Sequence, residues 1–450
     1  MSASPALLPP PDALAAWARA LWDALGAALA DENNADTQAL VGCGEEHLRA
    51  LRGALHDRDG DALDALVATA HACMAEAHRA AQPTLPWRRL YTDACILRSL
   101  VDVLEDRPEA DIVDAVARLD KAVIVAGPAG EGRLELILEF VARLQAALPP
   151  ALADPSPSHT FASTPFSPPP HPATSPTPIP RLRTPPSLAS FLATHAHAPF
   201  ILPRFARDWP ALATHSWASP AYLRAAAGPA RVVPVEVGRD YRADDWAPAF
   251  AGWDAFLDGL AAASAGAHGD VLYLAQHDLL KQFPALRDDV VVPDYAYAAP
   301  RAPAEYPDYR PPANEEQLVV NVWFGPAGTV SPAHTDPFFN LYTQVVGHKT
   351  VWLAPPHASP HMHAYSPSSS SPSDAQQHNP AANTTAPLLS NTSALDVFAS
   401  PAALPAEFVA RVVPHAVGAT LAPGDVLFFP PGWWHAMRAE QTSFSVSMWF

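Results

Sequence analysis

A proline-rich segment divides this chain and constrains its fold more than any other feature. Of the 38 residues from 149 to 186, 14 are proline, and Ser, Thr and Ala make up much of the rest. This composition favours an extended linker that buries no core, and a PxxP ligand is the alternative function that it allows. We therefore predict separate domains on either side of it, at residues 1–148 and 187–450.

Residues 1–148 have the pattern of an all-α domain. Apolar residues recur every three or four positions, as on the buried face of a helix, and turn-forming clusters interrupt them. We expect a helical bundle or repeat-like array that packs or docks a protein partner. The six expected helices are Leu14–Ala30, Leu48–Leu55, Leu63–Ala80, Leu90–Leu104, Ile112–Val125 and Leu134–Leu148.

Residues 187–450 change to short β-type runs separated by Pro and Gly. Closely spaced strands of this kind are typical of an antiparallel sandwich or barrel, so the expected fold class of the chain is α+β. A helix pair is expected at Leu188–His195 and Trp253–Ala262. A polar stretch at 358–387 predicts a low-complexity loop inserted in this domain. The expected strands are Phe200–Leu202, Val232–Val237, Val271–Ala275, Leu318–Phe324, Leu341–Val346, Thr350–Leu353, Val426–Phe429, His435–Arg438 and Ser443–Phe450.

The net charge of −18 makes the surface acidic. Such a surface repels nucleic acids and anionic lipids and attracts basic partners. Three cysteines without a spacing pattern argue against a disulfide or zinc framework, and no apolar run reaches the ~18 residues of a membrane span. The first residues also lack the charged region of a secretory signal. We expect an intracellular protein of the nucleus, the cytoplasm or both.

One short motif, His334-Thr335-Asp336, carries candidate metal ligands. In a strand, residues i and i+2 point to the same face, so the imidazole and the carboxylate would converge. Two histidines and one carboxylate form the facial triad that holds Fe(II) and leaves positions open for O₂ and a cosubstrate. The third ligand must come from a distant strand, and His435 follows a Pro-Gly turn between apolar runs.

The His-x-Asp motif alone is weak evidence for a metal site, because a second copy occurs at His268-Gly269-Asp270 in a stretch without strand character. We take His334, Asp336 and His435 as the metal ligands because their segments flank apolar runs. Other histidines compete for the third position, although most lie in the polar insert or at turns. They are His348, His357, His361, His363 and His415.

Lys349 is the second element of the candidate site. The chain has 25 Arg and only three Lys, so a lysine at the start of an apolar strand is an uncommon choice. Alternation places Lys349, Val351 and Leu353 on one face, which would line a barrel. A buried ammonium needs an anionic partner, and the distal carboxylate of a small dicarboxylate would supply it. A surface lysine at a hairpin end is the alternative.

Several ordered motifs of the C-terminal domain resemble the JmjC-domain Fe(II)- and 2-oxoglutarate-dependent oxygenases. They include NVWFGPAGTVSPAHTDPFFNLYTQVVGHKTVWL, VLYLAQHDLLKQFPALRDDV and GDVLFFPPGWWHAMRAEQTSFSVSMW. The resemblance implies a double-stranded β-helix barrel of the cupin type, with flanking helices. It also implies that 2-oxoglutarate and O₂ are consumed, succinate and CO₂ are released, and a C–H bond of the substrate is oxidised. The insert at 358–387 departs from the family pattern.

The resemblance also assigns residues to roles. Fe(II) would be bound by His334, Asp336 and His435. The 2-oxoglutarate site would be formed by Lys349, Tyr273 and Asn340, with Ser331 and Trp449 lining the pocket. The substrate site would be shaped by Glu236, Gln276, Trp323 and Trp246.

Two substrate chemistries remain open from the sequence. A carboxylate, an amide oxygen and tryptophan walls suit a guanidinium, which has five donors in a fixed fork. The leading hypothesis is therefore hydroxylation of arginyl side chains in a basic protein. Demethylation of N-methyl-lysine in a histone tail uses the same iron chemistry and is the first alternative. A non-catalytic JmjC scaffold is the second, although such a protein would be expected to have lost the triad or the lysine.

Overall fold

The computed structural model of the chain describes residues 11–105, 109–149, 160–161, 166–167, 172–238, 240, 242, 246–267, 269–365 and 389–450. The chain forms two compact units, which are considered separately. The first, called the helical unit, comprises Met1–Ser156 with the segments Ala227–Val233 and Phe250–Asp254. The second, called the β unit, holds Pro157–Ala226, Pro234–Ala249 and Ala255–Phe450.

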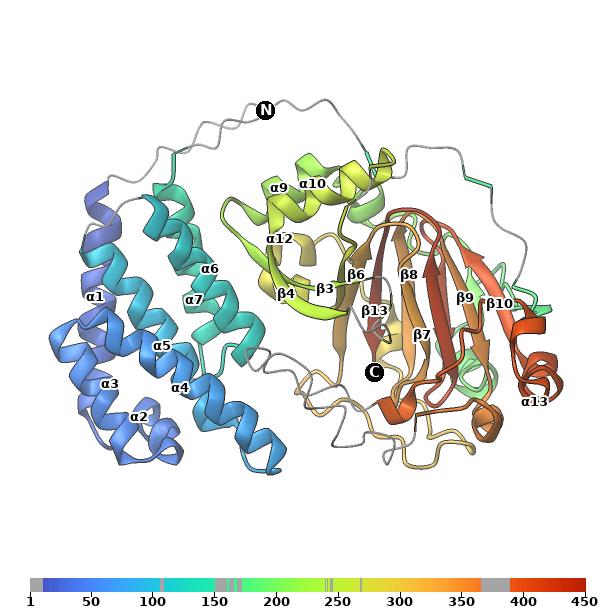
Figure 1. The fold of residues 1–450 in the computed structure, drawn as a ribbon, viewed down its shortest axis with the longest axis horizontal. Helices are drawn as coiled ribbons and strands as arrows, with labels where there is room; N and C mark the ends of the chain where they lie inside the picture. The colour runs from blue at the N-terminus through green and yellow to red at the C-terminus, as the bar shows by residue number, and fades with distance from the viewer. Residues whose placement is uncertain are drawn as a thin grey trace. The chain divides into compact units, whose positions relative to one another are not determined.

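The helical unit is built around α5, which is buried on nearly every side (Figure 1). Thirteen of its residues are buried, charged ones among them, and α5 packs against α1, α4 and α6, so it forms the centre of the bundle. The helices are α1 (Pro11–Ala30), α2 (Ala35–Leu40), α3 (Glu45–Asp57), α4 (Gly60–Arg79), α5 (Leu85–Leu104), α6 (Glu109–Ala126) and α7 (Arg133–Ala147).

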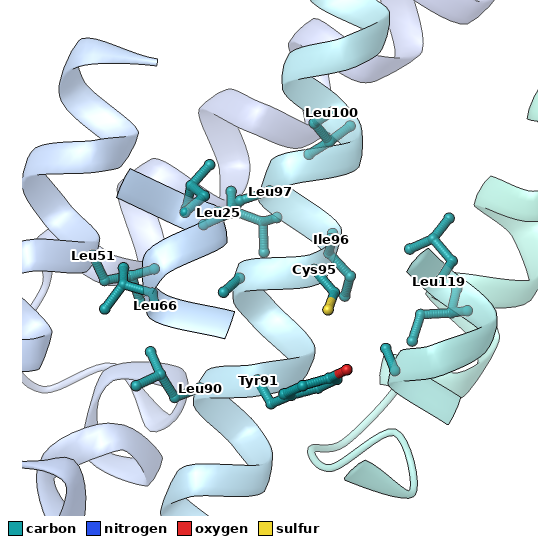
Figure 2. Close-up of a cluster of buried hydrophobic side chains, with 14 of the residues drawn as sticks. Leu25, Leu51, Leu66, Leu90, Tyr91, Cys95, Ile96, Leu97, Leu100 and Leu119 are labelled. Atoms are coloured by element: carbon teal, nitrogen blue, oxygen red, sulfur yellow. The ribbon is translucent and has the colours of Figure 1, made fainter. Parts of the chain in front are cut away.

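Leucine side chains from all seven helices form the core of this unit, and Tyr91, Cys95 and Ile96 of α5 pack among them (Figure 2). The charged residues of α5 are compensated where they are buried. Arg89 donates to Asp93 at 2.7 Å and to Asp36 at 2.6 Å, and Arg133 donates to the same two carboxylates. A buried ion network of this kind is tolerated because every charge has a partner.

All six helices predicted in this region are confirmed, with ends that differ by up to five residues. The prediction missed α2, a helix of six residues whose first turn is capped by the Asn34 side chain. It is too short to show a helical period in the sequence.

The β unit consists of two sheets (Figure 1). One has five strands in the order β1-β10-β9-β12-β7, and the other has eight in the order β2-β11-β8-β13-β6-β5-β3-β4. The strands are β1 (Thr177–Pro178), β2 (Phe200–Leu202), β3 (Val232–Val237), β4 (Ala247–Gly252), β5 (Leu272–His277), β6 (Val319–Gly325), β7 (Val330–Thr335), β8 (Asn340–Val346), β9 (Lys349–Ala354), β10 (Val417–Leu421), β11 (Val426–Phe429), β12 (Trp434–Ala439) and β13 (Ser443–Trp449).

Alternating residues of each strand point into the space between the sheets or away from it. Val351 and Leu353 of β9 belong to the inner cluster, together with Tyr342 of β8. Trp352 and Ala354 point outward, where helix α13 (Ala406–Arg411) covers them and Phe408 stacks on Trp352. The predicted α+β fold class is therefore confirmed.

The expected helix pair is also present, as α8 (Leu188–Ser190) continuing into a π-helical turn at Phe191–His195, and as α10 (Trp253–Ser264). None of the described helices has both the length and the apolar character needed to cross a membrane.

Part of the proline-rich segment packs on the β unit, which differs from the prediction of a linker that buries no core. Thr177 and Pro178 form β1, parallel to β10, and Ile179 joins the inner cluster with 2% of its surface exposed. The Thr174 hydroxyl donates to the Val397 carbonyl, and the Trp352 indole donates to the Thr174 carbonyl at 2.9 Å. A few apolar and hydroxyl side chains among the prolines are enough to make these contacts.

The predicted insert at 358–387 differs from the structure at its start. Ala358 and Met362 are fully buried in the cluster beneath α13, so residues up to Tyr365 belong to the folded unit. Residues 366–388 lie outside the described residues.

Candidate metal centre

Three predicted ligands meet at one end of the space between the two sheets. The ligand atoms of His334, Asp336 and His435 all lie within 4.8 Å of one another, and no other such group occurs among the described residues. His435 Nε2 is 3.4 Å from one Asp336 oxygen, and His334 Nε2 is 3.9 Å from the other. The structure therefore places together a set of two nitrogens and one carboxylate.

Strand pairing positions the two histidines. His435 of β12 lies opposite His334 of β7 in the antiparallel register. One extra residue in β7 then shifts the register, so that Met437 faces Ser331. Because of this bulge, Ser331 and His334 point to the same inner face although they are three residues apart.

Backbone contacts orient each ligand. The Nδ1 atom of His334 is 2.7 Å from the Pro332 carbonyl, and that of His435 is 3.0 Å from the Trp433 carbonyl. With Nδ1 protonated toward these carbonyls, Nε2 of each ring carries the free lone pair that a metal needs. Asp336 follows the end of β7, and its carbonyl accepts the Gly432 N–H at 2.9 Å.

The protonation states suit metal binding. Burial, and then repulsion from His435, lower the pKa of His334 to about 4, so this imidazole is neutral at physiological pH. Burial alone would raise the pKa of Asp336, but the neighbouring His435 and His334 imidazoles hold it below its usual value. Two imidazole nitrogens with one carboxylate are the donor set that suits non-haem Fe(II), so the residues fit the metal that the resemblance implies.

The competing histidines have other partners. His348 stacks on Phe166 and contacts the Gln441 side chain at 2.7 Å. His357 lies near Glu305 and the His415 ring, and His361 lies 3.0 Å from Glu407. His363 is not part of any described ligand group, and His268 of the second motif lies outside the described residues.

Lys349 is buried inside the β unit, with 1% of its surface exposed. Its Nζ donates to the Tyr342 hydroxyl at 2.9 Å and to the Tyr273 hydroxyl at 3.5 Å. No carboxylate pairs with it among the described residues, and burial lowers its pKa to about 7. An ammonium in such a place fits the distal carboxylate of 2-oxoglutarate, which would supply the missing anion.

The other residues assigned to the cosubstrate pocket lie on neighbouring strands. Ser331 lies close enough to Tyr273 to offset in part the rise that burial causes in the pKa of its phenol, and Tyr273 is 5% exposed. Asn340 begins β8, and its side-chain oxygen accepts the Ser447 hydroxyl at 2.9 Å. Trp449 lies opposite Asn340 in the register, and its buried indole N–H has no described acceptor.

Tyr342 was missed by the sequence analysis, although the signal was present. It lies two residues after Asn340, so strand alternation places both side chains on one face. Its ring is 5.6 Å from the Lys349 nitrogen, and burial raises its pKa, so the phenol stays protonated.

Three of the four predicted substrate residues lie beside residues that are assigned to the cosubstrate site or beside one another. Glu236 of β3 is opposite Tyr273 in the register, and burial raises its pKa. The buried Trp246 indole N–H lies close enough to lower that pKa in part, without a hydrogen bond of good geometry. Trp323 of β6 lies 5.9 Å from the Tyr342 ring and 6.4 Å from the Trp449 ring, measured between centroids.

Gln276 differs from the expected pairing with Glu236. Its side chain is exposed, its φ is 49°, and β5 is irregular between Leu274 and His277. None of the described hydrogen bonds joins Gln276 to Glu236. The irregularity breaks the alternation on which a shared face would depend.

Arg242 was also missed, and unlike Tyr342 it is indicated by no sequence pattern. It binds Asp240 through two nitrogens, at 3.0 and 2.6 Å, and donates to the Leu395 carbonyl at 2.8 Å. The segment after the insert also contacts β7, which carries His334, since the Ser393 N–H donates to the Ala333 carbonyl at 2.7 Å. Arg242 therefore ties the residues after β3 to a segment beside His334.

Comparison with known proteins agrees with this geometry. The pattern of the cupin-like domain matches residues 190–450. The chain is 35% identical over 281 residues to Jumonji C domain-containing protein 5 of Drosophila melanogaster, a match that covers 60% of this chain and 59% of the fly protein. It is 30% identical over 368 residues to lysine-specific demethylase 8 of Danio rerio, which covers 81% of each chain.

A plant relative, lysine-specific demethylase JMJ30 of Arabidopsis thaliana, is 32% identical over 271 residues, or 59% of this chain and 53% of its own. The chain thus spans little more than half of the fly and plant proteins. The zebrafish match is longer than the cupin-like region alone, so it extends beyond residues 190–450.

Proposed function

The chain belongs to the family of cupin-like JmjC domains, and from this premise we propose that it is an Fe(II)- and 2-oxoglutarate-dependent oxygenase that hydroxylates arginyl side chains of a basic protein. The observation that carries the proposal is the meeting of His334, Asp336 and His435 in a unit that also buries Lys349. A bound iron would activate O₂ for oxidation of a C–H bond, with electrons from the decarboxylation of 2-oxoglutarate.

The chain's own residues would bind and orient the reactants. Pro332 and Trp433 hold the histidine rings through their carbonyls, and Lys349 with its two tyrosines receives the distal carboxylate. Trp323 and Trp449 stand around the same space and would exclude water from it. Water exclusion strengthens each charged contact in the pocket.

Glu236 supports an arginyl substrate. It shares a face with Tyr273, and its pKa is raised by burial because no described cation pairs with it. A guanidinium would supply that cation and two parallel N–H···O bonds. Trp246 beside it could stack on the guanidinium plane. The acidic surface would attract a basic protein, of the kind found in both the nucleus and the cytoplasm.

Mass spectrometry of two peptides tests the proposal. The peptides differ only in an Arg or a trimethyl-Lys at the target position, and each is incubated with the protein, Fe(II), 2-oxoglutarate and ascorbate. We expect one oxygen atom to be added to the Arg peptide. Glu236→Gln should abolish this product but spare uncoupled 2-oxoglutarate turnover, while Glu305→Gln, an exposed control, should change neither.

Lysine demethylation is the second candidate function, because the zebrafish and plant relatives carry the name lysine-specific demethylase. Loss of methyl groups from the lysine peptide, with no oxygen added to the arginine peptide, would favour it. If the protein did not turn over 2-oxoglutarate at all, a non-catalytic scaffold would replace both candidates. The complete triad and the buried lysine argue against a scaffold.

A further inference from the structure

Lys349 is an amine in a place where a charge is poorly tolerated. Its side chain is among the largest fully buried ones in the described chain, and its only described hydrogen bonds are to two phenol oxygens. Burying an ammonium without an anion costs several kcal/mol, and the usual outcome is loss of the proton. In agreement, burial lowers the pKa of Lys349 from its ordinary value of 10.5 to about 7.

Among the described residues, the surroundings of Lys349 offer no charge that would offset this cost. Tyr273 approaches from β5 and Tyr342 from β8, while Leu421 of β10 and Ala439 of β12 are its apolar neighbours in the register. Glu236 of β3 lies opposite Tyr273 in the register, and neither it nor Asp336 forms a described ion pair with Lys349. A carboxylate that enters the pocket would therefore be the first counter-ion of Lys349.

We propose that this end of the pocket is a proton-coupled carboxylate site, in which binding of a dicarboxylate transfers one proton from solvent to Lys349, and in which Tyr342 positions the lysine nitrogen. The inference deepens the proposed function and rests on it, because that function supplies the dicarboxylate, 2-oxoglutarate. The step forms no covalent bond. The amine lone pair accepts a proton, and the resulting ammonium pairs with the incoming carboxylate.

Tyr342 is suited to hold the nitrogen in both states. A phenol can donate to the lone pair of a neutral amine and can accept from an ammonium. Tyr342 lies 0.6 Å closer to the nitrogen than Tyr273, at 2.9 Å against 3.5 Å. Because burial raises its own pKa, the hydroxyl keeps its proton over the physiological range.

The proposal sets the direction of a pH dependence. Below about pH 7 the lysine is already charged, so the dissociation constant of the dicarboxylate should not change with pH. Above that value the fraction of protein with a charged Lys349 falls up to tenfold for each pH unit. The dissociation constant should therefore rise by up to tenfold per unit. His334 stays neutral throughout this range, since its pKa is about 4.

Calorimetry of 2-oxoglutarate binding tests this inference with the full chain, loaded with Mn(II) under nitrogen so that no turnover occurs. Titrations in two buffers of different ionisation enthalpy count the protons taken up. We expect close to one proton at about pH 8 and close to none at about pH 6. Lys349→Arg keeps its charge at both values, so its binding should be independent of pH and take up no proton.

Two tyrosine variants test the positioning role. Tyr342→Phe, which removes one hydroxyl, should weaken 2-oxoglutarate binding about tenfold while proton uptake persists. Tyr295→Phe is the matched control, because its hydroxyl donates to the Pro186 carbonyl at 2.5 Å, and it should bind as wild type does. If Lys349→Arg does not fold, the wild-type proton count still decides the question.

Each result that differs from these expectations would overturn one specific claim. If metal-loaded wild type bound no 2-oxoglutarate at any pH, the proposed function itself would be wrong. If it bound 2-oxoglutarate with constant affinity and without proton uptake, the proton coupling would be wrong and the proposed function would stand. If Tyr342→Phe bound as tightly as Tyr295→Phe, the positioning role of Tyr342 would be wrong.

Discussion

At the scale of single residues, the two predicted histidine ligands are oriented in the same way. Each has its Nδ1 atom against the carbonyl two residues earlier, at Pro332 and at Trp433, and this leaves Nε2 free. The free nitrogens and Asp336 then act as one unit. Loss of any one of them should lower iron affinity and turnover together, because metal sites depend on the full ligand count.

We therefore predict that His334→Ala and Asp336→Ala each lose Fe(II)-dependent conversion of 2-oxoglutarate to succinate by at least about a hundredfold. Succinate release under saturating 2-oxoglutarate measures this loss. His268→Ala is the matched control from the second HxD motif and should behave as wild type. Wild-type turnover in His334→Ala would mean that the metal ligands are misassigned.

Lys349 carries a predicted cost in stability. In the unfolded chain its pKa is the ordinary 10.5, and in the folded chain it is about 7, so folding at pH 7 releases part of a proton. The penalty is complete below pH 7 and fades as the pH rises toward 10, where both states are neutral. Lys349→Met should therefore raise the free energy of unfolding by a few kcal/mol at pH 7, with a smaller gain at higher pH.

The same variant should bind 2-oxoglutarate about ten- to a hundredfold more weakly, with metal affinity nearly intact. Denaturant unfolding at two pH values and titration of 2-oxoglutarate measure the two effects. A Lys349→Met protein that is no more stable than wild type would show that the buried lysine does not destabilise the folded protein.

At the scale of elements, the proline-rich segment contributes to the barrel through β1 and Ile179. Ile179 is 2% exposed and packs in the inner cluster with Ile201 and Leu421. Ile179→Ala should cost about 2–4 kcal/mol of stability, as truncation of a buried aliphatic side chain usually does. Leu188→Ala, at a position 44% exposed, should cost less than about 0.5 kcal/mol. Equal costs in thermal or denaturant unfolding would show that β1 is not part of the folded core.

Deletion of residues from the insert, in contrast to Ile179→Ala, is expected to leave the stability almost unchanged. Its flanks are already paired, since Ala364 bridges Ser393 and the Tyr365 N–H donates to the Thr392 carbonyl at 3.0 Å. Residues 366–386 are rich in Ser, Pro and Asn, and closing a shorter loop between ends that are held together costs little. Their deletion should leave turnover close to wild type and the melting temperature within about 3 °C. A larger loss of melting temperature would show that these residues stabilise the barrel.

Elements with a regular periodicity could be predicted from the sequence, whereas those with an irregular backbone could not. Strand β7 contains a bulge and Pro332, which hide its alternation, yet it carries His334. Strand β10 contains Gly418, where an added Cβ would lie 2.4 Å from the Ser175 hydroxyl, so glycine is needed for the close approach of the proline-rich segment. Such requirements come from distant parts of the chain, and local patterns do not report them.

In the candidate site, too, some residues could be predicted from local sequence patterns and others depend on distant parts of the chain. The metal ligands and Lys349 could be selected because spacing and a rare residue type marked them, and alternation from Asn340 could have added Tyr342. The role of Arg242 depends on carbonyls of the segment near Leu395, about 150 residues further along the chain. Nothing near Arg242 in the sequence indicates that contact.

At the scale of the whole molecule, charge decides which reactants are attracted. The net charge of −18 should favour the approach of a basic peptide and oppose the approach of 2-oxoglutarate, which is a dianion. Long-range effects of both signs weaken as salt shortens the Debye length, which is about 10 Å at 0.1 M. The two reactants should therefore respond to salt in opposite directions.

We predict that raising the salt from about 0.05 M to about 0.3 M increases the Michaelis constant for a basic substrate peptide several-fold, while the Michaelis constant for the cosubstrate stays constant or falls. Both constants come from one assay, in which the two concentrations are varied in turn, so a general effect of salt on the enzyme would move them together. A peptide of equal length with its flanking Arg and Lys residues changed to Gln serves as the control, and its Michaelis constant should depend little on salt. If salt did not change the Michaelis constant for the basic peptide, recognition would depend on contacts inside the pocket, such as that with Glu236, rather than on the acidic surface.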